Sequence, residues 1–104
     1  MKRVAFKMQL LPGYEEEYQK RHDAIWPELV ELLHQNGISD YYIFLDPETH
    51  ILFATYMLSE DHQKDRLPQE AVMKKWWAYM KDIMETHEDN SPVSKALTDV
   101  FYMK

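Results

Sequence analysis

Tyr18 and His22 are the residues of this sequence whose types and spacing are best suited to chemistry. They are four positions apart in a stretch with helical periodicity. The apolar positions of that stretch are Tyr18, Ile25, Leu29, Leu32 and Leu33. His22 falls on the same stripe, where a purely structural helix would carry Leu or Ile. Because residues i and i+4 lie above one another, about 6 Å apart along the axis, both side chains can reach one pocket.

An imidazole can give or take a proton near neutral pH, so this pair predicts acid–base chemistry at an inward-facing site. The structural alternative is a core histidine bonded to a backbone carbonyl beside a partly buried tyrosine. The neighbouring phenol and the proline at position 27, which disturbs the helix just after His22, favour the chemical interpretation.

Three further aromatic residues are candidates for the walls of that pocket. Trp76 and Trp77 are adjacent on a predicted helix and point about 100° apart, so one faces the sheet and the other the gap between helices. An indole offers a flat apolar face to the C–H side of a sugar ring and an N–H donor to a hydroxyl. Tyr41 shares a strand face with Ile43 and Leu45 and points toward the helices. Core packing is the alternative for each of them.

Composition predicts a single compact domain over residues 1–104, since 104 residues with 45% hydrophobic content suit one core. The net charge of −6 argues against nucleic acid as a partner. The sequence has no cysteine, no apolar run of membrane-span length and no signal-peptide pattern after Met1. We therefore expect a cytoplasmic protein without a membrane partner.

Neither a metal nor another cofactor is expected. The histidines at positions 22, 34, 50, 62 and 87 form no pair at metal-ligand spacing. With two glycines in the chain, there is no glycine-rich phosphate loop. The sequence has no defensible Ser-His-Asp arrangement either.

The hydrophobic pattern predicts the order strand, helix, strand, strand, helix, strand, which is typical of ferredoxin-like antiparallel sheets with helices on one face. The strands are expected at 2–10, 38–46, 50–58 and 97–103. One helix, kinked near 23–26 by Pro27 rather than divided in two, ends at Asn36-Gly37. A short polar helix is expected over 59–66, capped by Ser59 and broken by Leu67-Pro68. A longer helix follows over 69–84.

The other face of this sheet would carry Tyr42, Phe44 and half of the third strand. So large an exposed apolar patch usually marks a partner surface. Two copies packed sheet to sheet would bury it, and this predicts a homodimer with the architecture of a dimeric α+β barrel.

Several segments, in order along the whole chain, resemble the L-rhamnose mutarotase family. They are Tyr18-Gln-Lys-Arg-His22, Ile25-Trp26-Pro27-Glu28-Leu29, Tyr41 with Leu45-Asp46, Trp76-Trp77-Ala-Tyr79-Met80, and Asn90-Ser91-Pro92-Val93-Ser94. The resemblance implies a cytoplasmic homodimer of the dimeric α+β barrel kind that acts in rhamnose metabolism. It implies interconversion of the α and β anomers of L-rhamnose without a cofactor.

By the same resemblance, His22 is the catalytic proton donor and Tyr18, Tyr41, Trp76 and Trp77 bind the sugar. The base is a tyrosine, a carboxylate or water. Domains of this size and fold also include cofactor-free monooxygenases and lactone isomerases, so fold alone does not fix the reaction. A non-catalytic sugar-binding module is the other alternative.

Overall fold

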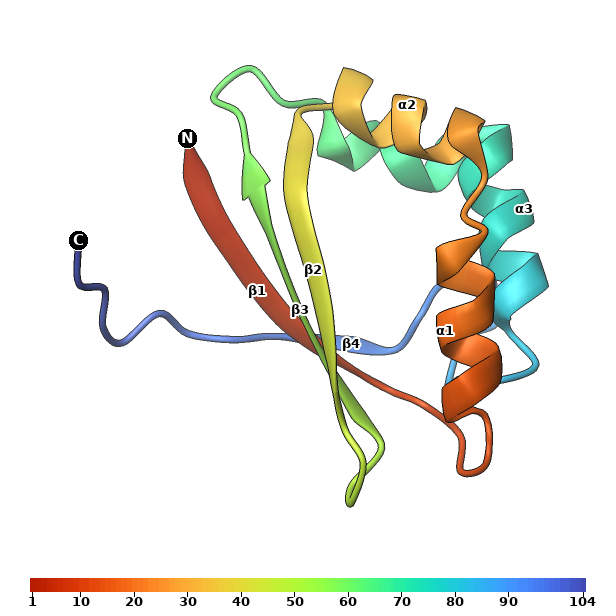
Figure 1. Cartoon of the computed structure of the whole chain (residues 1–104). Helices are drawn as coiled ribbons and strands as arrows, with labels where there is room; N and C mark the ends of the chain where they lie inside the picture. The colour runs from red at the N-terminus through yellow and green to blue at the C-terminus, as the bar shows by residue number, and fades with distance from the viewer.

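The computed structural model describes all 104 residues and contains one four-stranded antiparallel sheet with the strand order β2-β3-β1-β4. The strands are β1 (Lys2–Gln9), β2 (Ile38–Asp46), β3 (Ile51–Leu58) and β4 (Ser94–Ala96). The helices are α1 (Glu15–Asp23), α2 (Pro27–Gln35), the 3-10 helix η1 (Lys64–Gln69) and α3 (Ala71–Met80). The helices lie on one face of the sheet, so the predicted ferredoxin-like α+β fold is confirmed (Figure 1).

The core lies between this sheet and the helices. On β3, Leu52, Ala54, Tyr56 and Leu58 are buried, whereas the residues between them face the opposite side. Leu29 of α2 and Ile83 after α3 are almost fully buried against this layer. The alternation predicted for β3 therefore sets which face of the sheet meets the helices.

The prediction of one kinked helix is wrong, because Pro27 separates two helices. Trp26 has ψ 128°, the extended conformation that the residue before a proline prefers, and Pro27 then opens α2 at its first position. The chain turns sharply between α1 and α2 (Figure 1). Tyr18 of α1 and Leu29 of α2 nevertheless belong to one buried core.

The short helix predicted over 59–66 is also wrong. The backbone N–H groups of Ser59 and Gln63 donate to the carbonyl oxygens of Gly37 and Asn36, at 2.9 and 3.0 Å, and so close onto the end of α2. Gly37, at φ +89°, is the predicted left-handed cap, and a side chain there would collide with Ser59 and His62. Helical structure begins only at Lys64 and continues through Pro68, because the buried Leu67 anchors η1 against the core.

The last predicted elements also have different bounds. The helix α3 ends at Met80 instead of residue 84, since Leu11 N–H donates to the Ile83 carbonyl and Met84 pairs with Leu10. The final strand is Ser94–Ala96 instead of 97–103, and its last hydrogen bond to β1 is from Leu97 N–H. Beyond it the chain runs away from the helices with its apolar side chains exposed (Figure 1).

The face of the sheet opposite the helices exposes a cluster of aromatic side chains. Tyr42 and Phe44 are 55% and 59% exposed, and their rings stack at 5.7 Å. Phe53 of β3 pairs with Phe44 and is also exposed. We call this surface, formed by Tyr42, Phe44 and Phe53, the outer aromatic face.

Candidate active site

His22 lies in the last turn of α1, beneath a stacked tyrosine. The ring centroids of Tyr18 and His22 are 4.2 Å apart with an interplanar angle of 26°. His22 Nδ1 is 3.0 Å from the carbonyl oxygen of Tyr18. A carbonyl oxygen only accepts hydrogen bonds, so Nδ1 carries the proton in this contact and the neutral ring has its lone pair on Nε2.

Burial lowers the pKa of His22 below its ordinary value, although the Tyr18 carbonyl and the charge of Asp23 oppose this shift. The imidazole is therefore neutral at pH 7, with Nε2 as a proton acceptor. Burial raises the pKa of Tyr18, so this phenol keeps its proton and serves as a hydrogen-bond donor.

One indole of α3 packs directly against the imidazole, and a second indole, just before α2, packs against the first. Trp76 is buried and meets His22 edge to face, with ring centroids 5.4 Å apart. Trp26 meets Trp76 in the same way at 5.1 Å. Trp77, the next residue on α3, is partly buried and packs against the core. The two adjacent tryptophans thus present different faces to the interior, as their helical spacing predicts.

Tyr41 approaches the same space from the sheet. Its ring centroid is 5.2 Å from that of Tyr56 and 6.5 Å from that of Phe6. Tyr41 is 40% exposed. Part of this exposed surface is wall of the cavity that is described next. Desolvation, and then the neighbouring Tyr18 and Tyr56, raise the pKa of Tyr41, so this phenol also stays protonated.

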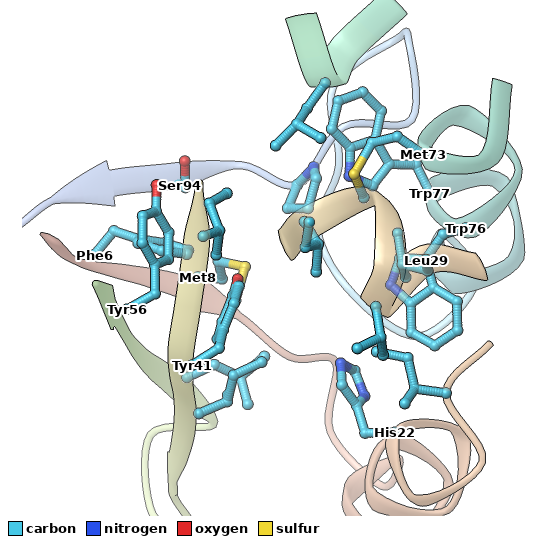
Figure 2. Close-up of a pocket in the computed structure, with 18 of the residues that line it drawn as sticks. Phe6, Met8, His22, Leu29, Tyr41, Tyr56, Met73, Trp76, Trp77 and Ser94 are labelled. Carbon is cyan, nitrogen blue, oxygen red and sulfur yellow. The ribbon is translucent and has the colours of Figure 1, made fainter. Parts of the chain in front are cut away.

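One cavity of about 1090 Å³ is lined by these residues, with the exception of Trp26. A smaller recess of about 80 Å³ is also lined by all five residues that the sequence singled out, namely Tyr18, His22, Tyr41, Trp76 and Trp77. Figure 2 shows Phe6, Met8, Tyr41 and Tyr56 on the sheet side and His22, Trp76 and Trp77 on the helix side. The larger volume lies just above the usual range for small-molecule sites, about 300–1,000 Å³.

Arg21 is a neighbour of the site that the sequence analysis did not identify. Its side chain is 10% exposed and pairs with Glu17 at 2.8 Å and Asp82 at 2.9 Å. It also donates to the carbonyl oxygen of Tyr79 at 2.7 Å and lies over the Tyr79 ring. Arg21 thereby ties the helix that carries His22 to the end of α3. The spacing of Glu17 and Arg21, four apart on one helix, was the available signal.

Tyr56 was also missed as a residue of the cavity wall, and Trp26 was missed as the residue that packs against Trp76. Tyr56 shares the inward face of β3 with Leu52 and Ala54, and this alternation was a signal for its position. Trp26 had no such signal, because its orientation follows from the break before Pro27.

No three His, Cys, Asp or Glu side chains are grouped closely enough to hold a metal ion. None of the helices has both the length and the apolar character needed to cross a membrane.

The comparisons with known proteins agree with one another. The sequence model of the L-rhamnose mutarotase family matches residues 3–103. An L-rhamnose mutarotase from Jannaschia sp. (strain CCS1) is 60% identical over 103 residues, which cover 99% of both chains. One from Rhizobium leguminosarum bv. trifolii is 58% identical, covering 99% of this chain and 97% of its own.

The crystal structure of an L-rhamnose mutarotase from Formosa agariphila superposes with a TM-score of 0.93. It is 49% identical in sequence and covers all of both chains. The matched family model and these relatives span the whole fold, including the segments that form the cavity. The chain belongs to the L-rhamnose mutarotase family.

Proposed function

We propose that this chain is an isomerase that interconverts the α and β anomers of L-rhamnose. Membership of the family and relatives named L-rhamnose mutarotase at up to 60% identity support the reaction and the sugar. The structural observation that carries the proposal is the position of His22, a neutral imidazole with an unprotonated Nε2 beside a cavity lined by phenols and indoles.

His22 acts as the acid and, in this proposal, also as the base. Its neutral tautomer has no proton to give at Nε2, so the ring first accepts the proton of the anomeric hydroxyl. The C1–O1 bond becomes a carbonyl, the bond from C1 to the ring oxygen breaks, and Nε2–H returns the proton to that oxygen. Rotation about C1–C2 and the reverse steps close the other anomer. Both oxygens are attached to C1, so one imidazole can serve both, and such a group contributes roughly 10²–10⁴-fold.

Tyr18, Tyr41, Trp76 and Trp77 bind the sugar in this proposal. Both phenols hold their protons, because burial raises their pKa values, and therefore donate to ring hydroxyls. The indoles offer flat apolar faces to the C–H side of the pyranose. The reaction moves only protons and one C–O bond, so we propose that it proceeds without a cofactor.

We further propose a homodimer in which the outer aromatic faces of two copies pack together as a dimeric α+β barrel. This surface is apolar and exposed in the single chain, which supports an obligate partner. The exposed apolar residues after β4 would gain cover in the same assembly. Each copy contributes one α+β barrel domain, residues 1–104.

The proposed location is the cytoplasm. The absence of cysteine from the sequence supports a reducing compartment, where disulfides contribute little to stability. No membrane or nucleic-acid partner is proposed.

Saturation-transfer NMR tests the function directly. Irradiation of one anomeric proton of L-rhamnose should transfer saturation to the other anomer faster when micromolar protein is present. Saturable binding of L-rhamnose with no change in exchange would instead identify a non-catalytic module. The absence of both binding and acceleration would refute the proposal.

A further inference from the structure

The strand β2 contains one more residue than its partner between two points of the ladder. Ser39 pairs with Met57 and Tyr42 pairs with Thr55, so β2 advances three residues while β3 advances two. This is a β-bulge. Asp40 lies within it at φ +50°, in the left-handed region that non-glycine residues seldom adopt.

The bulge decides the direction of Tyr41. Ile38 is buried opposite Leu58, and Ile43 lies opposite Ala54, so both face the helices although they are five residues apart. In a regular strand, residues an odd number apart face opposite sides. A strand that kept regular alternation from Ile38 onward, with no bulge, would turn Tyr41 to the outer face. The bulge is what places Tyr41 on the cavity side.

Arg3 of β1 reaches this bulge from the outer face of the sheet. Its Nη2 donates to Asp40 Oδ2 at 2.6 Å, and its Nη1 donates to the Asp40 carbonyl oxygen at 3.3 Å. Nη1 also lies 3.4 Å from Thr55 Oγ1, on the strand between them. One guanidinium therefore holds both the side chain and the backbone of the residue with positive φ, across two strands.

We propose that Arg3 and Asp40 are positioning residues that hold the β2 bulge and so direct Tyr41 into the cavity. Asp40 is among the residues that line the cavity, but neither Asp40 nor Arg3 bonds to His22 or to the indoles, and both act through the register of β2. The kinetic consequence rests on the proposed function, because it requires Tyr41 to bind the sugar. The orientation of Tyr41 does not depend on that function.

Ring-to-ring NOEs between Tyr41 and Tyr56 measure this orientation without any substrate, since the two rings are 5.2 Å apart. Asp40→Val should weaken these NOEs most, because a β-branched residue resists positive φ. Arg3→Met, which leaves β2 unchanged and removes only the guanidinium, should weaken them partly. Asp40→Asn should retain them, because Asn tolerates positive φ and can still accept from Arg3. Lys7→Met, on the same face of β1 as Arg3, is the matched control and should change nothing.

Anomer-exchange kinetics provide the functional readout. Asp40→Val should raise KM for L-rhamnose about tenfold, as expected for loss of one hydrogen bond, and leave kcat within about twofold because His22 is on another element. Arg3→Met should raise KM about threefold, since an exposed pair is individually weak. In a Tyr41→Phe background the KM effect of Asp40→Val should largely disappear, because both changes remove the same contact.

Three results would overturn the proposed role of Arg3 and Asp40. Unchanged NOEs in both Arg3→Met and Asp40→Val would overturn the proposal, as would equal effects of Arg3→Met and Lys7→Met. A KM increase of the same size in the Tyr41→Phe background would overturn it too, because Asp40 would then act elsewhere. If the parent protein fails to accelerate exchange, the proposed function fails, and the NOEs still decide the role of the bulge. Sedimentation of each variant separates these effects from a change in assembly.

Discussion

Tyr41 and Tyr42 are consecutive tyrosines on one strand, and they belong to different environments. Tyr41 contacts Phe6 and Tyr56 from other strands and lines a cavity with His22. Tyr42 stacks on Phe44 of its own strand and is more than half exposed. The inner face is closed by contacts between elements, whereas the outer aromatic face has only contacts along the sheet. This difference underlies our proposals that the inner face of the sheet binds the sugar and the outer aromatic face binds a second copy.

The strongest test of the inner face is His22→Ala. Loss of the proposed acid–base group should reduce kcat/KM for anomer exchange by roughly 10²–10⁴-fold and leave the circular dichroism spectrum intact. His62→Ala is the matched control, since His62 does not line the cavity. Equal activity of both variants would remove His22 from the mechanism.

Trp76→Ala tests how far the inner aromatic contacts stabilise the fold. Trp76 is buried and meets His22, Trp26 and Tyr79, so the change should lower the free energy of unfolding by about 3–5 kcal/mol. Lys75→Ala, at the exposed preceding position, should change it by less than about 0.5 kcal/mol. Urea unfolding at one protein concentration measures both, and similar values would show that the indole contributes little packing.

Phe44→Lys tests the outer aromatic face. A charge placed among apolar side chains at a buried interface is unfavourable, so the sedimenting mass should fall from twice 12.6 kDa toward 12.6 kDa. Gln69→Lys adds the same charge on the helix side and should leave the mass unchanged. A Phe44→Lys protein that sediments as a dimer would locate the interface elsewhere.

The smallest expected effect is the pH dependence that His22 adds to stability. Because burial lowers the folded-state pKa of His22, the unfolded chain binds more protons between its pKa of about 6.5 and the lowered value. The free energy of unfolding should therefore be unaffected by His22 above pH 6.5 and fall as the pH drops through this window. Urea unfolding of the parent and of His22→Gln should show a steeper decline for the parent. Parallel curves would indicate that the imidazole is not desolvated.

The pH dependence of anomer exchange should reflect the same lowered pKa of His22. The neutral form of His22 persists below pH 6.5, so the activity plateau should extend below that value.

The sequence predicted best what depends on neighbours along the chain. Tyr18 and His22 meet within one turn of α1, so their i, i+4 spacing was sufficient to bring them together. The alternation along β2 and β3 was equally local, and it separated Tyr41 from Tyr42 correctly. Pro27 marked the correct place for a disturbance. The helix ends there instead of bending because Trp26 takes the extended conformation that precedes a proline, a local preference that hydrophobic periodicity does not encode.

Features that depend on distant partners were not predicted. Ser59 was assigned as a helix cap because of its residue type, yet its backbone bonds to Gly37, twenty-two residues earlier. Arg21 was not singled out from the sequence, because its partners Tyr79 and Asp82 lie 58 and 61 residues later in the chain. To predict the bulge at Asp40, one must know that both Ile38 and Ile43 face the core. Each of these failures involves a contact between elements far apart in the sequence.

The hydrogen bond from His22 Nδ1–H to the carbonyl oxygen of Tyr18 has an evolutionary consequence. In many enzymes a carboxylate side chain fixes the histidine tautomer, and one mutation deletes it. Here the acceptor is a peptide group, which every amino acid at position 18 supplies. Genetic drift at that position can alter the stacked ring, but the proton stays on the same nitrogen for as long as the helical turn persists.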